Sequence, residues 1–228
     1  MTTSSKLLLF DIDGTLMRTN RIPLNIVKDV LAEFVDREID WSPKDFAGST
    51  DRKIIRTLIR KNNITTDDIE TSTDSFLKRY LARLEQTLKE RDVVNLLPGV
   101  TDLLATCSTR EFSMGLVTGN VERGARLKLG PPNFNPYFPI GAFGNDAEDR
   151  NLLPNMALER AEQHYQRSFD HKDCWIIGDT PHDVECAKVS GMNCLAVTTG
   201  IYDATTLGDA DYIAEDLSDT ENIINQFL

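Results

Sequence analysis

The sequence predicts an α/β protein, with a doubly wound parallel sheet and a helical segment inserted after the first strand. Short runs of entirely apolar residues recur along the chain, and each stops abruptly at polar residues or glycine. Amphipathic stretches with helical spacing alternate with these runs. Strands that are apolar on both faces are typical of parallel sheets covered by helices on both sides. Because ligands of such folds bind beyond the carboxyl ends of the strands, polar residues at strand ends are the first candidates for a site.

Strands and helices are predicted in alternation over most of the chain. The predicted strands are 7–10, 114–117, 140–143, 174–177 and 193–197. The predicted helices between them are 100–106, 121–129, 153–165 and 181–189. Pro181 supports the start of the last helix, because the first turn does not need its missing N–H. The segment 131–136 contains three prolines and is predicted to lack regular structure.

The alternation is interrupted between residues 17 and 92, where apolar residues fall only at helical spacing. The first such series is Leu24, Val27, Leu31 and Phe34. Two further series predict helices around 54–59 and 76–88, with Ser49 or Thr50 capping the former and Thr66 the latter. We therefore expect residues 1–16 and 93–228 to form the core and residues 17–92 to form an inserted helical domain.

Composition narrows the function classes. The 228 residues include 36 acidic and 25 basic side chains, which gives a formal net charge of −11. Negative charge repels phosphate backbones and anionic lipids, so we expect neither a nucleic acid nor a membrane as a partner. No apolar run reaches the roughly 20 residues of a membrane span, and the four cysteines form no C-x-x-C pair. These features favour a cytoplasmic protein. Because the net charge is negative, an anionic ligand would need a cationic side chain close to its site.

Two acidic motifs follow predicted strands. The first places Asp11 and Asp13 directly after the first strand, and the second contains Asp179 and Asp183. Two carboxylate clusters at one edge of a sheet would repel each other unless a cation lay between them. Carboxylate oxygens suit Mg²⁺, a hard ion that keeps water ligands for substrate phosphate. The sequence therefore predicts a Mg²⁺ site at this edge.

A third motif, Thr118-Gly119-Asn120, supplies a hydroxyl, an amide and permissive backbone at another strand end, which suits phosphate oxygens. In this order, the three motifs resemble those of the haloacid dehalogenase superfamily. The resemblance covers nearly the whole chain and is greatest to members similar to phosphoglycolate phosphatase. It implies a Rossmann-like core with an α-helical cap inserted after the first strand, in agreement with the periodicity of residues 17–92.

The resemblance also implies a role for each acidic residue. Asp11 would be the nucleophile that forms an aspartyl-phosphate, and Asp13 would protonate the leaving alcohol and then activate water. Thr118 would bind the transferring phosphoryl group. Mg²⁺ would be held by the Asp11 side chain, the Asp13 backbone carbonyl and Asp179, with Asp183 orienting the metal shell.

One family feature is missing. The superfamily's third motif is a lysine, often in K-P-x-P, and the basic residue in the corresponding region here is Arg150. Arginine can carry the charge and offers a fork of donors to phosphate, so we expect Arg150 to be catalytic and to bind substrate. Gly119 and Asn120 are further substrate-binding candidates. Arg18 and Arg52, on either side of the first predicted cap helix, are candidate cations for the substrate.

The leading function is thus a Mg²⁺-dependent phosphatase that acts on a small phosphorylated metabolite. A sugar phosphomutase would use the same covalent intermediate and stays open. A 2-haloacid dehalogenase would use the same attacking aspartate without Mg²⁺, but Asp13 and the acidic fourth motif disfavour it. A binding module that keeps the fold without the chemistry also stays open, because the family lysine is missing. The sequence does not indicate the oligomeric state.

Overall fold

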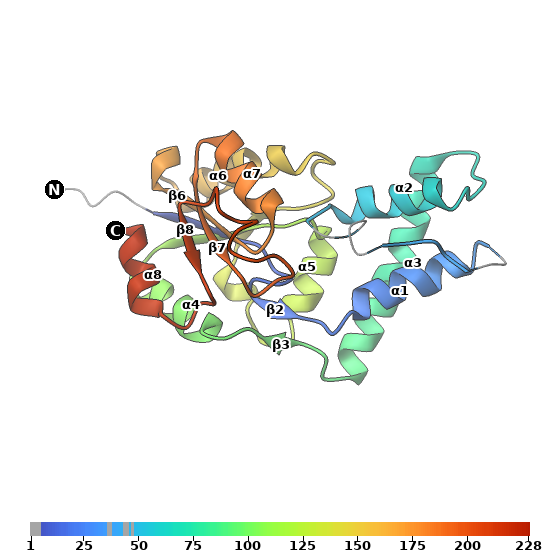
Figure 1. Ribbon diagram of the computed structural model, residues 1–228, viewed down its shortest axis with the longest axis horizontal. Coiled ribbons are helices and arrows are strands. Elements are labelled where there is room, and N and C mark those ends of the chain that lie inside the picture. Colours follow the sequence, from blue (N-terminus) through green and yellow to red (C-terminus); the bar gives the residue numbers. More distant parts are fainter. Residues whose placement is uncertain (1–5, 36–37, 43–45, 47) are drawn as a thin grey trace.

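A six-stranded parallel sheet forms the centre of the protein (Figure 1). The computed structural model describes residues 6–35, 38–42, 46 and 48–228. The strands lie in the order β5-β4-β1-β6-β7-β8. Their bounds are β1 Leu7–Phe10, β4 Ser113–Val117, β5 Ile140–Ala142, β6 Cys174–Gly178, β7 Asn193–Val197 and β8 Tyr212–Ala214. Every pair of neighbours is parallel, so the predicted sheet type is confirmed.

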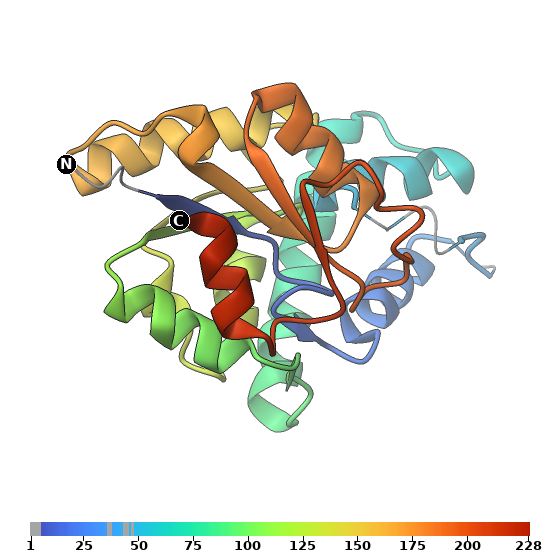
Figure 2. The same cartoon turned by 60° about the vertical axis from the view of Figure 1, so that its left-hand side comes forward.

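Helices cover both faces of this sheet (Figure 2). Successive side chains of a strand point to opposite faces, and β1 feeds two separate hydrophobic clusters: Leu8 and Phe10 belong to one, Leu7 and Leu9 to the other. The first cluster packs against α4 (Val100–Thr109), α5 (Glu122–Leu129) and α8 (Thr220–Phe227). The second packs against α6 (Leu153–Tyr165) and α7 (Pro181–Ser190). The continuous apolar runs are explained by this burial on two faces.

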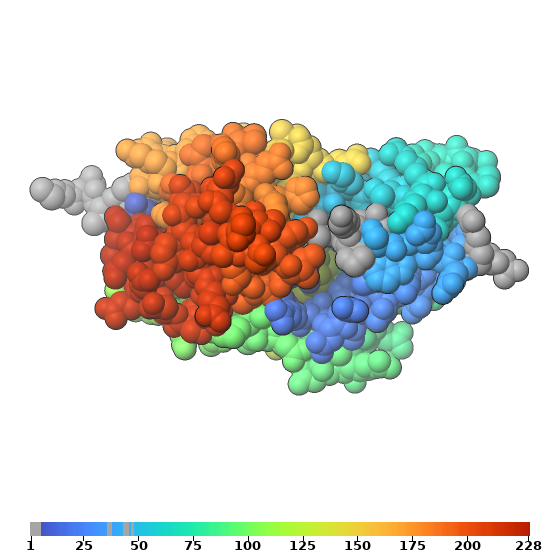
Figure 3. Space-filling view, in the orientation of Figure 1, coloured from blue at the N-terminus to red at the C-terminus, as the bar shows by residue number. Residues whose placement is uncertain are grey.

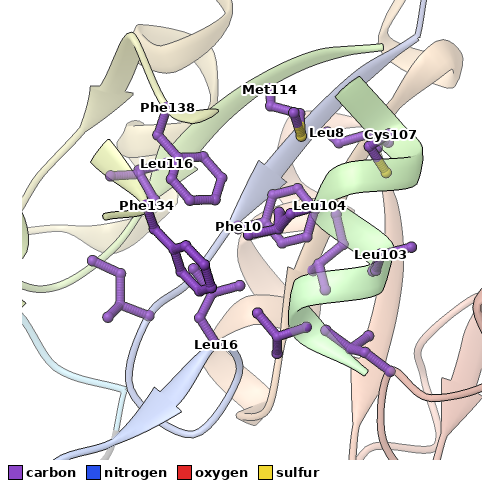
Figure 4. Close-up of a cluster of buried hydrophobic side chains, with 14 of the residues drawn as sticks. Leu8, Phe10, Leu16, Leu103, Leu104, Cys107, Met114, Leu116, Phe134 and Phe138 are labelled. Carbon is purple, nitrogen blue, oxygen red and sulfur yellow. The ribbon is translucent and has the colours of Figure 1, made fainter. Parts of the chain in front are cut away.

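Aromatic rings fill part of the first cluster. Figure 4 shows Phe10 of β1 with Leu104 of α4 and Phe138 around it. The rings of Phe10 and Phe138 have centroids 5.6 Å apart and are tilted by 59°, a favourable arrangement for aromatic pairs. This packing fixes the position of β1, and the residues that follow its carboxyl end are positioned with it.

Three helices lie together at one end of the molecule, beside the part that contains the sheet (Figures 1 and 3). They are α1 (Ile22–Ala32), α2 (Asp51–Lys61) and α3 (Ile69–Glu90). Their apolar faces share a hydrophobic cluster of their own, which also takes in Val121 and Leu127 from the region of α5. Two short antiparallel strands, β2 (Met17–Arg18) and β3 (Asn95–Leu96), pair where the chain enters and leaves this segment. The division at residues 17 and 92 stays a prediction, and we refer to the three helices as the cap.

The structure differs from several local predictions. Thr50 does cap α2, accepting from the Lys53 amide, but α3 is capped by Asp68 and not by Thr66, because Asp68 accepts from two amides of the first turn. The predicted irregular segment 131–136 is wrong at its end, since Asn135–Tyr137 forms a 3₁₀ turn (η2) in which proline occupies a first-turn position. The strand β8 and the helix α8 were not predicted. None of the helices in the described part of the chain is long and apolar enough to cross a membrane.

Candidate active site

Three polar segments meet beyond the carboxyl ends of the central strands. Asp11 directly follows β1, Thr118 follows β4 and Asp179 follows β6, and these strands are neighbours in the sheet. The backbone amide of Asp11 donates to the carbonyl of Ile177 at 2.9 Å, which holds the start of the loop against β6. The parallel sheet therefore brings together motifs that lie 61 to 168 residues apart in the sequence.

Asp11, Asp179 and Asp183 form a buried carboxylate cluster. One oxygen of each lies within 4.8 Å of the others, and none is more than 5% exposed. Asp183 lies in the first turn of α7, where its carboxylate accepts from the amide of Thr180 at 3.0 Å and from its hydroxyl at 2.7 Å. Asp179 accepts from the hydroxyl of Thr15 at 3.2 Å. The helix cap thus fixes one carboxylate of the cluster in place.

Arg150 reaches this cluster from the 3₁₀ turn η3 (Arg150–Leu152). Its Nη2 lies 3.3 Å from Asp11 Oδ1 and also donates to Asp183. Its Nη1 donates to the carbonyl of Gly48 at 3.3 Å, so the same side chain also touches the loop before α2. The residue predicted to replace the family lysine is buried between the two carboxylates.

The charges in the cluster do not balance. Burial raises the pKa of Asp11 to about 6, although the adjacent Arg150 guanidinium and a hydrogen bond from Thr118 act in the opposite direction. Burial, with the neighbouring carboxylates of Asp11 and Asp183, raises the pKa of Asp179 well above its usual range. One guanidinium therefore faces three carboxylates, and a further cation would relieve the remaining repulsion.

The donor set fits Mg²⁺, because carboxylate oxygens are the ligands this ion prefers. Two glycines also leave room beside Asp179. A Cβ atom at Gly14 would lie 2.3 Å from Asp179 Oδ2, and one at Gly200 would lie 1.8 Å from the same oxygen. Gly14 also has a φ of +87°, which L side chains rarely adopt. Asp11, Asp179 and Asp183 are therefore the residues that could hold a divalent cation.

Asp13 belongs to a second group, which includes a residue that the sequence analysis missed. Asn120 donates to Asp13 Oδ2 at 2.8 Å. The ammonium group of Lys128 donates to the same carboxylate, and also to Asn120 Oδ1 at 2.6 Å. Lys128 is only 2% exposed and lies in the last turn of α5. A buried lysine thus contacts the predicted acid–base residue.

A signal for Lys128 was present in the sequence. The buried face of α5 includes Ala125 and Leu129, and the position before Leu129, three residues after Ala125, falls on that same face. A charged residue at an apolar helical position is unusual unless it has a buried partner. The residue was overlooked because a lysine in the last turn also suits the helix dipole on the surface.

Residues of both groups, although not Asp183, line one cavity of about 670 Å³ between the core and the cap. Thr118, Gly119 and Asn120 line it, as do Gly48 and Ser49 from the loop before α2. A Cβ atom at Gly119 would lie 2.3 Å from the carbonyl oxygen of Ser49. The absence of a side chain at Gly119 therefore lets the cap loop approach the strand end closely.

Asp51, the first residue of α2, ties the cap to the same strand end. Its backbone amide donates to the carbonyl of Gly119 at 2.8 Å, and its Oδ2 accepts from the amide of Val121 at 2.9 Å. Burial raises the pKa of Asp51 to about 6, although the Lys128 ammonium opposes this shift. The cap is thus held directly over the candidate site.

The two predicted cap cations differ in their surroundings. Arg18 lines the cavity and donates to the carbonyl of Thr199. Arg52 does not line it, because its guanidinium is paired with Asp74 at 2.6 Å and Glu70 at 2.9 Å. The structure therefore brings Arg18 to the cavity and pairs Arg52 with acidic residues of α3 instead.

Comparison with known proteins identifies a family and several relatives. The family model described as haloacid dehalogenase-like hydrolase matches residues 8–197. A pyrophosphatase, PpaX, from Oceanobacillus iheyensis is 23% identical over 227 residues, which is 97% of each chain. A phosphoglycolate phosphatase from Synechococcus elongatus is 24% identical over 224 residues, 97% of this chain and 98% of that protein.

Solved structures with the same fold include enzymes of more than one kind. A β-phosphoglucomutase from Clostridium difficile has a TM-score of 0.76 at 14% identity, over 99% of this chain and 97% of that one. CbbY from Rhodobacter sphaeroides, solved in complex with phosphate, has a TM-score of 0.73 at 17% identity, over 94% of this chain and 96% of that one. At these identities the likeness establishes the fold alone.

Proposed function

The chain belongs to the haloacid dehalogenase-like hydrolase family, and from this membership we propose that it is a Mg²⁺-dependent phosphatase of small-molecule phosphomonoesters. The observation that carries the proposal is that Asp11, with its carboxylate neighbours and Arg150, lies in the same cavity as Asp13 and Thr118. The phosphatase and pyrophosphatase names of the relatives support a reaction at phosphorus. A cytoplasmic location remains a prediction.

In the first step, a carboxylate oxygen of Asp11 attacks the phosphorus atom of the ester. An Asp11–phosphorus bond forms and the bond to the alcohol oxygen breaks, while protonated Asp13 gives its proton to that oxygen. A carboxylate is a weak nucleophile, so positioning and charge neutralisation supply most of the acceleration. Arg150, which contacts Asp11 at 3.3 Å, offers one of these charges.

In the second step, Asp13 takes a proton from a water molecule as that water attacks the phosphorus atom of phosphorylated Asp11. The bond between Asp11 and phosphorus breaks, which releases inorganic phosphate and restores both aspartates. Thr118, whose hydroxyl bonds to Asp11, and the neighbouring amides are suited to hold the phosphoryl oxygens. When bound, Mg²⁺ supplies positive charge at the phosphoryl group and offsets the repulsion between substrate and carboxylates.

Lys128 is a second cation for this reaction. In the structure it pairs with Asp13 and Asn120 inside the cavity. An incoming phosphoryl group brings new hydrogen-bond acceptors near this ammonium group. If the ammonium group exchanged its hydrogen bond to Asp13 for one to a phosphoryl oxygen, Asp13 would be free to carry a proton. Arg150 stands in the third motif where the family has a lysine, and Lys128 adds an amine from α5.

The experiment that tests this function is phosphate release from a panel of phosphomonoesters with and without Mg²⁺, by the wild type and by Asp11→Asn. We expect Mg²⁺-dependent release that the substitution abolishes, because an amide cannot attack phosphorus and removes a metal-ligand charge. Asp29→Asn, on the exposed face of α1, is the matched control. Substantial activity in Asp11→Asn would overturn the nucleophile assignment, and a phosphorylated isomer as the product instead of phosphate would indicate a mutase.

A further inference from the structure

The cap side of the cavity is lined mainly by apolar side chains. They come from α1, α2 and the segment between these helices: Leu24, Val27, Trp41, Phe46, Ile54 and Ile55. Trp41 and Phe46 lie edge to face, with ring centroids 5.9 Å apart. The catalytic groups described above lie on the core side. The half of the cavity that would receive the alcohol part of a substrate is therefore the apolar half.

The charged side chains of the cap half do not favour an anionic alcohol. Arg18 and Arg21 line the cavity, but both are exposed, where water and salt weaken their attraction for an anion. Asp51 lines the cavity beside the buried apolar residues, and its carboxylate would repel a second negative group. A carboxylate or a second phosphate on the substrate would thus lose water on the apolar side of the cavity and face the carboxylate of Asp51 there.

The volume of the cavity also favours a substrate with a large apolar group. A volume of about 670 Å³ falls in the range of sites that enclose drug-sized ligands. A phosphoryl group with a two-carbon acid would leave most of the apolar wall in contact with water. A larger apolar group would displace that water and gain the free energy of burial.

We propose that the preferred substrates are phosphomonoesters of bulky, uncharged, largely apolar alcohols, and not of small acids such as glycolate. This inference rests on the proposed phosphatase function and names the substrate class of the same site. The Tyr80 side chain from α3, which is 2% exposed and lines the cavity, adds an aromatic wall with a polar end. It could accommodate a hydroxyl group on an otherwise apolar substrate.

The test is kcat/KM of the Mg²⁺-loaded wild type for ethyl, butyl, hexyl and benzyl phosphate, compared with phosphoglycolate and glycerol 2-phosphate. Each methylene that becomes buried should raise kcat/KM about fourfold, which is its transfer free energy converted to a ratio. Hexyl and benzyl phosphate should therefore exceed ethyl phosphate and phosphoglycolate by more than tenfold. Efficient turnover of phosphoglycolate with no gain along the alkyl series would overturn the inference and leave the phosphatase function intact.

Release of phosphate from none of these esters would overturn the phosphatase function, and the inference with it.

A cap variant adds a second readout. Leu24 is only partly buried, so Leu24→Asp should fold, and thermal unfolding checks this. It should lower kcat/KM for hexyl phosphate at least tenfold and lower that for glycerol 2-phosphate by a clearly smaller factor. The matched control is Val189→Asp on α7, which is 63% exposed and outside the cavity. Equal losses for both esters in Leu24→Asp would contradict an apolar subsite.

Discussion

The ammonium group of Lys128 donates a hydrogen bond to the carboxylate of Asp13, although Lys128 lies on α5 and Asp13 follows β1. Both side chains also bond to Asn120, so the three form a small closed network at the edge of the cavity. Burying a lysine costs free energy unless its charge is paired and its protons have acceptors. The network supplies both conditions and holds a positive charge where a phosphoryl group would bind.

Replacement of this lysine should impair catalysis more than folding. In Lys128→Met, an apolar side chain of similar length fills the same space, but the charge near the phosphoryl oxygens is lost. Removal of one donor that stabilises a transition state typically lowers kcat by about 10²- to 10³-fold, and we expect a loss of this order in kcat for an aryl phosphate.

The matched control for this variant is Lys188→Met. Lys188 also occupies the last turn of a helix, α7, but its side chain is 72% exposed. Its replacement should leave kcat within about twofold of the wild type. A Lys128→Met enzyme as active as the Lys188→Met enzyme would mean that Lys128 is only a structural partner of Asp13.

Arg150→Ala should lower the free energy of unfolding, and the loss should depend on pH. Removal of one partner from a buried ion pair typically costs about 3–5 kcal/mol, because the other charges are left unpaired. The pKa of Asp11 is raised to about 6, so this residue is mostly ionised at pH 7 and mostly protonated at pH 5. The attraction between Asp11 and Arg150, which the substitution removes, is therefore stronger at pH 7 than at pH 5.

Urea unfolding without Mg²⁺ at these two pH values measures the effect. Arg150→Lys, which keeps the charge but not the fork of donors, should lie between the wild type and Arg150→Ala. An equal loss of unfolding free energy at pH 5 and pH 7 would show that packing of Arg150, and not its charge, stabilises this region.

Mg²⁺ should raise the melting temperature, and the increase should grow between pH 5 and pH 7.5. Metal ligands must be deprotonated to bind, and the pKa of Asp11, raised to about 6, means that protons compete with the metal below about pH 6. The raised pKa of Asp179 adds to this competition. A ligand at 100 times its Kd stabilises the native state by about 2.7 kcal/mol. Differential scanning fluorimetry across this pH range, with and without the metal, measures the shift.

Two variants link that shift to Asp179. Asp179→Asn should abolish most of it by removing a charged ligand. Gly200→Ala should reduce it without changing any charge, since the new Cβ atom would displace the Asp179 carboxylate. Gly124→Ala is the control, because a Cβ there meets its nearest atom at 3.5 Å, an ordinary contact. A shift of undiminished size in Asp179→Asn would place the metal elsewhere.

The sequence predicted much of the sheet because its strands are buried on both faces. Continuous apolar runs ending at Asp11 and Asp179 leave few alternatives to a parallel sheet with these residues at one edge. The strand β8 was not predicted because its apolar run, Tyr212–Ala214, is short, and each of these residues is only partly buried. The change of cap from Thr66 to Asp68 is of another kind. Both residues suit an N-cap, and it is Asp68 whose carboxylate accepts from the amides of the first turn.

The carboxylates of the candidate site were predicted, but the contacts of its helical side chains were not. Carboxylates after strands are visible in the sequence, but the contacts of a side chain on a helix depend on how that helix packs. Lys128 and Arg52 both look like surface cations, yet one is buried beside Asp13 and the other is paired with Asp74 and Glu70. The roles assigned to these residues remain predictions.

The central claim is that Asp11 carries the phosphoryl group and Asp13 releases it, and intact-protein mass spectrometry of Asp13→Asn tests it most directly. With Mg²⁺ and an aryl phosphate, whose leaving group needs little protonation, the first step should continue in this variant while hydrolysis of the intermediate loses its base, a loss of about 10²- to 10⁴-fold. We expect a burst of one phenolate per enzyme and a phosphoryl adduct that peptide mapping assigns to Asp11, with none in the Asp11→Asn/Asp13→Asn double variant. Release of phosphate by the wild type, with neither burst nor adduct in Asp13→Asn, would contradict the account.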